Sequence, residues 1–570
     1  MIFSQLVDSL INETAGHSLA CFAPELAISI TIVLLLVVRL VNLDRFVPTY
    51  MFALLGAVVA FGLALYQGYE LSKPDAVSST YFTGLMIHDH FTVFFRVFLL
   101  LFLILTITLT VLTGIPDNED GPDFYTLLLG ASLGMVMMAG ANHLLMLFLA
   151  IEMASVPSYV MVGFLKGRKQ SSEAALKYVV YGAGTAGVML YGISLLCGLL
   201  GTGDMSEITT RVVMLAQGAP EAVALGVGDG TVRAIVLAIV LVLVGLAFKL
   251  SLVPFHFWCP DAFEGASAEV GGFLSVASKA GAFALLLRFV LAFTGTDPAQ
   301  ASPLSEVYMY IGLGLGFIGI LTATYGNLTA YAQTNIKRLL AYSTIAHAGY
   351  MVMAVSALMV IMNAPESGGT IDRVADAGLA IQGLLYYLAV YMFMNLGAFA
   401  VVALIRNQTF SEEIDDYSGI VRQAPALAIC MLFCMFSLIG IPPFGGFFAK
   451  FMVFGAIYKA YHVHWFMMVV LAAAGLNTVV SLFYYMRVLK VMFIGERPAD
   501  ARPVKIAAQP NAYVVALAAF VLLLGVLPRF MSNLTDRAEA IGNEVLTQDF
   551  SAEPSGPMSV AEPTVAQDNH

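Results

Sequence analysis

The stretches FKLSLVPFHFW (248–258) and GIPPFGGFFAKF (440–451) decide how this chain folds. Each lies in a long apolar run that proline interrupts, and each carries a lysine near the interruption. Proline removes a backbone donor and clashes with the carbonyl four residues earlier, so a helix that contains it breaks or kinks. In hydrocarbon the freed polar groups need partners in the protein or in water. The two stretches therefore predict broken membrane helices with a hydrated point, although a simple packing kink would leave the same pattern.

Composition places the whole chain in a membrane. Of its 570 residues, 59% are hydrophobic and 11% are charged, and the mean hydropathy is +0.85. A soluble globular protein carries about 25% charged residues, so a soluble enzyme and a disordered chain are excluded. The net charge of −11 excludes a nucleic-acid binder, because that function needs a basic face. The five cysteines form no CxxC pair and predict no disulfide scaffold, zinc site or iron–sulfur cluster.

About fourteen apolar stretches are long enough to span a bilayer, since a helical span needs about 20 residues. Barrel strands are not expected, because their segments of about 10 residues alternate in polarity and these runs do not. The sequence predicts an all-α polytopic membrane protein with about 14 transmembrane helices. Their centres are expected near Ile32, Val59, Leu103, Met135, Ala154, Met189, Leu241, Ala284, Leu315, Met353, Val390, Leu432, Leu476 and Leu522.

Basic residues indicate the orientation. They cluster after span five, before span ten and after span thirteen, three loops that share one side in a fourteen-span topology. The positive-inside rule assigns that side to the cytoplasm. The loops 203–231 and 362–377 have few basic residues and are expected outside, with both termini. The basic clusters contain Lys166, Arg168, Lys169, Lys337, Arg338, Arg487, Lys490, Arg497, Arg502 and Lys505.

Two parts of the chain resemble each other at a spacing of roughly 190 residues. Residues 158–163 parallel 349–354, and the two proline-broken stretches follow in the same order. Each unit would hold five spans, an odd number, so the second copy is inverted, as in many transporters. The expected order is helices 1–3 (1–122), a first repeat of helices 4–8 (123–297), a second repeat of helices 9–13 (298–492), a loop with helix 14 (493–531) and a disordered acidic tail (532–570), with helices 7 and 12 broken.

Six ionisable residues lie at or near membrane depth and are the candidates for function. A charged side chain in the middle of a membrane helix costs about 2.5–3.5 kcal/mol on insertion scales, so each needs a reason. The candidates are Glu152, Lys249, Lys279, Lys450, His256 and His347.

Each candidate also has a structural explanation. Glu152 and Lys249 would make a static buried ion pair. Lys279 and Lys450 would extend to the membrane interface. Either histidine would be a packing residue bonded to a carbonyl.

Two further pairs have ordinary explanations. Glu173 and Lys177 are spaced as a surface pair on one helix. Cys430 and Cys434 share a helix face and are expected to be small packing residues rather than metal ligands.

The functional interpretation of the six candidates is a path for protons. An unperturbed lysine has a pKa near 10.4, too high for proton exchange at neutral pH. Burial lowers the pKa of a lysine by up to 3–5 units, and a nearby carboxylate raises it again. A shift of three units is worth roughly 4 kcal/mol, which is about the cost of moving a proton against ~180 mV. Making and breaking a Glu152–Lys249 pair would therefore let the lysine take up and release a proton.

Four motifs resemble the antiporter-like membrane subunits of respiratory complex I, the NADH–quinone oxidoreductase. They are KLSLVPFHFWCPDAFEGA (249–266), SVASKAGAFALLLRF (275–289), NIKRLLAYSTIAHAGYMVM (335–353) and SLIGIPPFGGFFAKF (437–451). The block SSEAALKYVVYGAGTAGVMLYGISLL (171–196) is similar to one subunit type within that family. The resemblance covers about residues 20–530.

The resemblance implies inverted repeats in spans 4–8 and 9–13 and one proton channel in this subunit. It places all six candidates in that channel, with the histidines helping to link its two halves. Electron transfer from NADH to quinone would occur in other subunits, so no cofactor or metal is expected in this chain. The implied partners are neighbouring complex I subunits and lipid, not nucleic acid, in a bacterial inner membrane.

Three alternatives stay open. One is a subunit of a multicomponent Na⁺/H⁺ antiporter, and another is the same module in a ferredoxin-, F420- or hydrogenase-linked complex. The third is a structural membrane subunit that pumps nothing.

Overall fold

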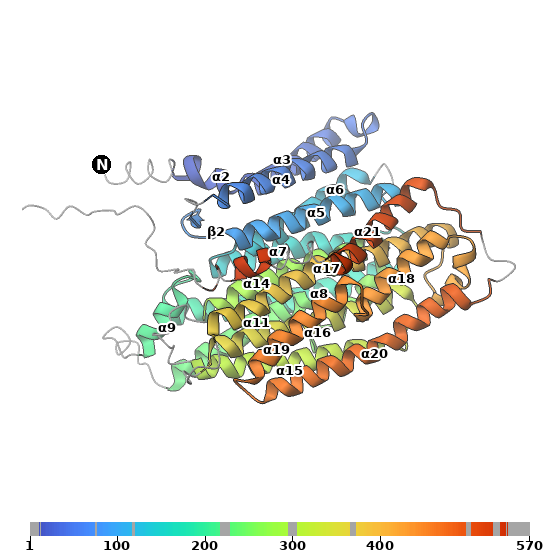
Figure 1. Cartoon of the computed structure of the whole chain (residues 1–570). Helices are drawn as coiled ribbons and strands as arrows, with labels where there is room; N and C mark the ends of the chain where they lie inside the picture. The colour runs from blue at the N-terminus through green and yellow to red at the C-terminus, as the bar shows by residue number, and fades with distance from the viewer. Residues whose placement is uncertain are drawn as a thin grey trace, which may run out of the picture.

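The computed structural model describes residues 11, 13–73, 77–116, 120–216, 229–293, 305–364, 372–497, 503–527, 536–542, 544 and 546. Within these ranges, thirteen helices are long and apolar enough to cross a membrane, or up to fourteen if one bent pair counts as a span. They run along a common direction (Figure 1). Each of the fourteen predicted span centres lies within a helix. The predicted all-α, multi-span architecture is therefore confirmed.

The long helices follow the predicted order along the chain. They are α3 (Ala23–Leu40), α4 (Thr49–Leu71), α5 (His90–Thr113), α6 (Gly121–Gly140), α7 (Leu144–Val162), α8 (Lys169–Leu200), α11 (Asp229–Leu250), the continuous α13 (Ala268–Phe273), η3 (Leu274–Ser278) and α14 (Lys279–Leu291), then α15 (Ser305–Ala330), α16 (Ile336–Met362), α17 (Arg373–Thr409), α20 (Phe466–Ile494) and α21 (Ala508–Val526). The shorter elements are η1 (Thr14–Ser18), α2 (Leu19–Cys21), η2 (Leu43–Arg45), β1 (Ser79–Tyr81), β2 (Met86–His88), α9 (Ile208–Ala216), α12 (Trp258–Gly265), η4 (Ile414–Tyr417), η5 (Ile420–Arg422), α18 (Pro425–Ile439) and α19 (Gly445–Tyr461).

Helices 7 and 12 are broken where the prolines predict. The first consists of α11 and α12, separated by the non-helical residues 251–257 around Pro254. The second consists of α18 and α19, separated by residues 440–444 with two prolines. Gly440 ends α18 at a φ of +91°, a left-handed conformation that glycine adopts without a steric penalty.

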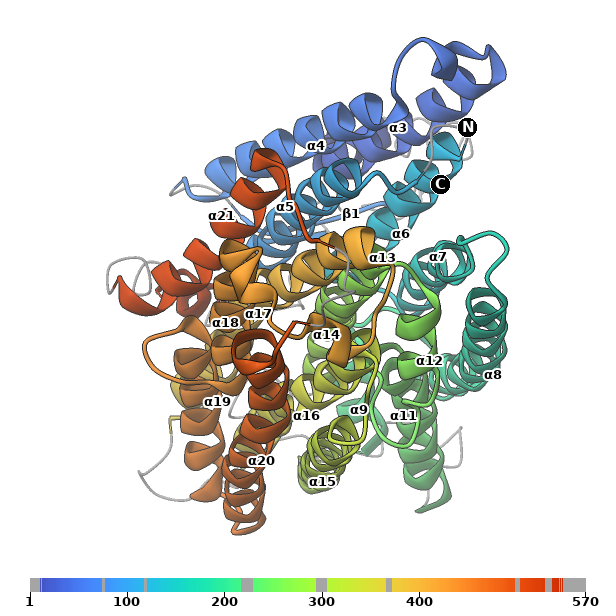
Figure 2. The ribbon, with the colours of Figure 1, turned by 90° about the vertical axis from the view of Figure 1, so that its right-hand side faces the viewer.

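Three of the spans form the centre of the bundle. The apolar window of residues 268–291 is completely buried. In α16 and α17, 94% of the corresponding window is buried, whereas in α8, α20 and α21 only 28% is buried. Seen from another side, α16 and α17 lie between α8, α15, α20 and α4 (Figure 2). The buried helices carry Lys279 and His347, whereas the peripheral helices expose apolar side chains to their surroundings.

The three basic loops meet at one end of the bundle. Glu412, after α17, pairs with Lys337 at 2.9 Å and with Arg168 at 3.9 Å. Arg487, near the end of α20, donates to the carbonyl of Gln333 in the same region. The described structure thus agrees with the one-sided distribution of positive charge.

The loops contain structure that hydropathy did not predict. Strands β1 and β2 form a small antiparallel hairpin before α5, and α9 lies in the long loop after α8. The predicted boundary at 297–298 lies outside the described residues, and the domain limits stay predictions.

The prediction of a disordered tail over 532–570 is wrong for residues 536–542, which are helical. Ala538 and Leu546 are each 1% exposed, and Glu544 pairs with His90 at 2.6 Å. Although the composition of this segment is acidic, its apolar side chains are buried against the bundle. Residues 547–570 lie outside the described part of the chain.

Candidate functional site

Lys279 binds the carbonyl that the break in helix 7 leaves free. In a continuous helix the carbonyl of Leu250 would accept from the N–H of residue 254, but Pro254 has none. The Lys279 Nζ donates to that oxygen at 2.6 Å instead. Lys279 is 2% exposed and follows the π-helical turn η3, a feature often found at functional sites. The alternative that this lysine extends to the interface is excluded.

Lys450 likewise binds the carbonyls that the break in helix 12 leaves without a helical donor. The carbonyls of Leu438 and Ile439 lose their helical partners because residues 442 and 443 are prolines. The Lys450 Nζ donates to both oxygens, at 3.0 and 2.9 Å. It also lies 4.8 Å from the centre of the Tyr350 ring and is 4% exposed. A cation at this position is favoured because carbonyl dipoles point at it from the helix C-terminus.

Lys249 is fully buried, and a hydroxyl is its partner. Its Nζ donates to the Ser155 Oγ at 3.0 Å, from the end of α11 to the middle of α7. Glu152, one turn earlier on α7, is partly buried and interacts with Lys249 electrostatically. Among the described residues no ion pair within 4.0 Å joins them. Glu152 and Lys249 therefore do not form a static buried ion pair in this structure.

His347 lies at the centre of an aromatic cluster. Its Nδ1 is hydrogen-bonded to the Tyr387 hydroxyl at 2.6 Å, and its Nε2 to the Tyr485 hydroxyl at 3.3 Å. The ring of Tyr391 lies 5.3 Å from the imidazole. Both nitrogens thus bond to hydroxyls, which exchange protons, and not to the backbone carbonyl that a packing role would supply.

A short polar chain runs between the helix of Lys279 and that of His347. The Asn395 amide on α17 donates to the Ser275 Oγ at 2.6 Å and to the Tyr391 hydroxyl at 3.1 Å. Sequence reasoning missed these three residues. An amide inside YYLAVYMFMNLGAFA (386–400) was a usable signal, because a buried amide needs partners.

His256 is not a satisfied packing residue. It is 2% exposed, and neither ring nitrogen has a hydrogen-bond partner in the described protein. The imidazole contacts the rings of Phe257 and Tyr325, with centroids 4.3 and 4.4 Å away. It lines a cavity of about 300 Å³ with Asp261 and Arg338 among its neighbours.

A second buried polar network joins helices α3, α4 and α5. Arg96 donates to the Glu25 carboxylate at 2.7 Å and to the Gln67 amide oxygen at 2.9 Å. The same guanidinium contacts His88 at 3.0 Å and the Tyr81 hydroxyl at 2.9 Å. Hydropathy did not indicate it, because Glu25 and Arg96 are single charges at the ends of apolar runs. None of the six candidates belongs to it.

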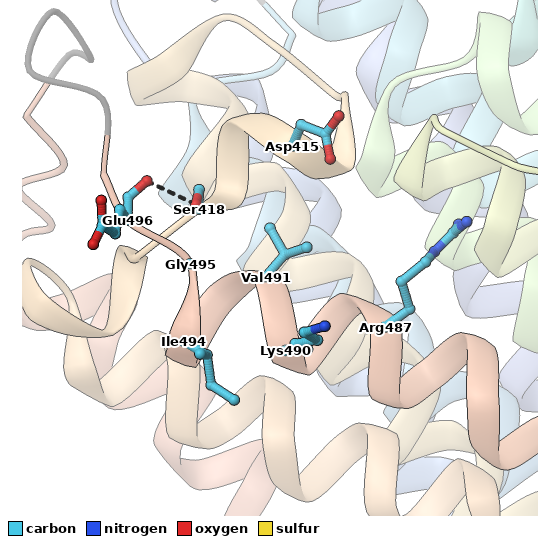
Figure 3. A pocket seen from close by; sticks show the side chains of 8 residues that line it. All are labelled: Asp415, Ser418, Arg487, Lys490, Val491, Ile494, Gly495 and Glu496. Carbon is cyan, nitrogen blue, oxygen red and sulfur yellow. Dashed lines mark hydrogen bonds between the residues drawn. The ribbon is translucent and has the colours of Figure 1, made fainter.

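A larger cavity, of about 480 Å³, lies beside the end of α20 (Figure 3). Asp415, Arg487, Lys490 and Glu496 line it, so it is a surface hollow of mixed charge. It contains no candidate residue. Within the described residues, no group of three or more His, Cys, Asp or Glu is placed to hold a metal ion.

The chain matches the family described as NADH:quinone oxidoreductase/Mrp antiporter, TM, over residues 141–366 and 370–476. It is 38% identical over 529 residues to the NADH-quinone oxidoreductase subunit N of Anaeromyxobacter sp. (strain Fw109-5), covering 91% of this chain and 95% of the relative. The chain belongs to this family. A subunit N of Desulfitobacterium hafniense (strain DSM 10664 / DCB-2) is 36% identical and covers 79% of this chain and 83% of its own length.

Two solved structures share the fold. A chain of respiratory complex I from Thermus thermophilus with bound aureothin is 30% identical, with a TM-score of 0.66, covering 89% of this chain and 98% of its own. A chain of the Mrp complex from Dietzia sp. DQ12-45-1b has a TM-score of 0.74 at 18% identity, covering 93% of this chain and 100% of its own. The second likeness shows the fold alone. All six candidates lie within the range that matches the family.

Proposed function

We propose that this subunit N-type chain translocates protons across the membrane as part of an NADH:quinone oxidoreductase. The relatives named subunit N span nearly its whole length, which supports the assignment to that complex. The observation that carries the proton path is the placement of Lys279 and Lys450 on carbonyls that the broken helices leave free. The path consists of Glu152, Lys249, Lys279, His256, His347 and Lys450.

Proton exchange at these lysines needs little rearrangement. A protonated ammonium has three donors and a neutral amine still has two. A carbonyl or hydroxyl partner therefore keeps its hydrogen bond when the lysine releases a proton, whereas a carboxylate partner would be left charged and unpaired. Movement of Glu152 toward Lys249 would favour proton uptake, and its withdrawal would favour release.

The electron-transfer chemistry is assigned to other subunits, so this chain holds no cofactor or metal. The end with the basic loops faces the cytoplasm of a bacterial inner membrane, and both termini lie outside, as the positive-inside rule predicts. The resulting enzyme is the whole complex, in which this chain couples quinone reduction to proton movement.

The deciding experiment is NADH-driven proton uptake in vesicles that carry the complex with Lys249→Ala. We expect normal assembly on a native gel and fewer protons moved per NADH, because the fully buried ammonium is lost. Lys166→Ala is the matched control, since that lysine is 79% exposed at the bundle end. Unchanged pumping by an assembled Lys249→Ala complex would make this lysine structural.

A multicomponent Na⁺/H⁺ antiporter subunit is the second candidate, because the description of the matching family names the Mrp antiporter beside the oxidoreductase. The antiporter function predicts Na⁺-dependent proton exchange without NADH. Proton movement that strictly requires NADH and quinone excludes it.

A further inference from the structure

The cavity beside His256 lies near the bundle end that carries the basic loops. Lys177 on α8, Asp261 on α12 and Arg338 on α16 line it together with the imidazole. Arg338 stands in the first turn of α16, next to Lys337 and its partner Glu412. The cavity is therefore close to water on one side and reaches a buried histidine on the other.

His256 indicates that the cavity is hydrated. Its two ring nitrogens have no partner in the described protein, although the side chain is 2% exposed. An imidazole always offers hydrogen-bonding nitrogens, and buried polar groups are nearly always satisfied. A volume of about 300 Å³ holds several water molecules at ~30 Å³ each. Water in the cavity is the partner that the histidine requires.

Asp261 binds two cationic side chains, and each of them also binds a second carboxylate. Its Oδ1 accepts from Arg338 at 2.7 Å, and its Oδ2 accepts from Lys177 at 2.8 Å. Lys177 also pairs with Glu173 at 2.8 Å, and Arg338 with Glu264 at 2.6 Å. The expected helix-surface pair Glu173–Lys177 is thus present but is one part of a five-charge cluster. Each cation keeps a carboxylate partner if it leaves Asp261.

We propose that this cavity is the vestibule through which protons from water reach the buried path, with Asp261 as the first acceptor and His256 as the second. While both cations bind Asp261, its protonated form is disfavoured. When Lys177 turns to Glu173 and Arg338 turns to Glu264, the carboxylate accepts a proton from hydronium and releases a water. The carboxylic acid then passes that proton through cavity water to a nitrogen of His256 and becomes a carboxylate again.

The vestibule and the second half of the molecule share helix α16. Arg338 and His347 stand nine residues apart on that helix, about 13 Å along its axis at 1.5 Å per residue. A rigid shift of α16 on proton transfer at His347 would therefore also move Arg338 relative to Asp261. Proton uptake in the first repeat would in this way be linked to the protonation state of His347 in the second repeat. The inference rests on the proposed proton translocation.

The test uses the whole complex in vesicles and compares Asp261→Asn with Lys177→Gln. We measure protons moved per NADH and the passive proton leak without NADH. Asp261→Asn should lower the ratio, as we expect Lys249→Ala to do, and Asp261→Glu should restore it. Lys177→Gln should raise the passive leak severalfold, because one of the two cations that close the vestibule is gone. Glu413→Gln, an exposed acid at the same end, should change neither.

The outcomes separate the vestibule from the path itself. Equal losses in Asp261→Asn and Lys177→Gln with unchanged leak would make the cluster structural and overturn the proposal. Normal pumping by Asp261→Asn beside impaired pumping by Lys249→Ala would also overturn it and leave the proposed function intact. Normal pumping by an assembled Lys249→Ala complex would instead make Lys249 structural and remove it from the proposed path, whatever Asp261→Asn does.

A labelling experiment covers the case in which Asp261→Asn does not assemble. Tyr181→Cys places a thiol in the cavity wall, where the tyrosine is 48% exposed. A membrane-impermeant cationic thiol reagent added from the basic-loop side should then block pumping. The control is Ser172→Cys, which is exposed on the same helix but lies outside the cavity. Full pumping after labelling of Cys at 181 would contradict the proposal.

Discussion

At the residue scale, the three lysines of the proposed path share one property: neutral oxygen atoms are their partners, whereas the buried Lys337 pairs with Glu412. Lys249 uses a hydroxyl, whereas Lys279 and Lys450 use main-chain carbonyls. A permanent carboxylate partner would hold the charge in place, because breaking a buried ion pair leaves an uncompensated charge that costs several kcal/mol. Neutral partners leave the lysines able to exist in both protonation states.

Substitutions at Lys450 separate its charge from its hydrogen bonds. Lys450→Gln retains an amide donor for the carbonyls of Leu438 and Ile439 but carries no exchangeable charge, so we expect impaired pumping with little loss of stability. Lys450→Met leaves both carbonyls without a donor and should also destabilise the protein by about 1–3 kcal/mol. Proton uptake and thermal unfolding of the two variants check this. Normal pumping by Lys450→Gln would remove Lys450 from the path.

At the element scale, each broken helix supplies the acceptors, and a lysine that follows the break in the sequence supplies the donor. The lysine for helix 7 comes from the next span, whereas that for helix 12 comes from its own second half, α19. Residues 440–444 therefore leave the carbonyls of Leu438 and Ile439 without a helical donor inside the bundle, where Lys450 binds them.

Restoring the missing donors should close the break in helix 12. In Pro442→Ala/Pro443→Ala both residues regain an N–H that bonds to the carbonyls of Leu438 and Ile439, in competition with Lys450. We expect slower hydrogen–deuterium exchange over 438–444 and impaired proton uptake. Pro425→Ala is the control, because Pro425 is at the start of α18, where a proline removes no helical bond. Unaltered exchange would show that the break does not depend on the prolines.

At the scale of the whole molecule, the segment made of residues 536–542, 544 and 546 joins the N-terminal helices to α17. Glu544 pairs with His90 at the start of α5, and Glu539 accepts from Gln382 on α17 at 3.4 Å. Its apolar side chains pack on the same end of the bundle. The segment is a clasp between parts of the chain that are distant in sequence.

Truncation tests the clasp. Removal of residues 536–570 should lower the thermal unfolding temperature of the complex, because buried apolar side chains and a partly exposed ion pair are lost. Removal of 547–570 alone serves as the control and should change the temperature little. Pumping per NADH should be unaffected in both variants, since Glu544 and Glu539 bind His90 and Gln382, which are not part of the proposed path. Equal stability of the two truncations would show that the clasp contributes nothing.

The sequence by itself determined the membrane class, the spans, the two breaks and the buried charges, because hydropathy, proline and isolated lysines are local signals. Only the tertiary structure decided that Lys249 meets Ser155 rather than Glu152, that Asn395 joins two central helices, and that Asp261 lies between cations from α8 and α16. In a chain that is 59% hydrophobic, apolar side chains cover every face of a helix, so periodicity does not show which face packs against which neighbour. Partners that are distant in sequence are set by that packing alone.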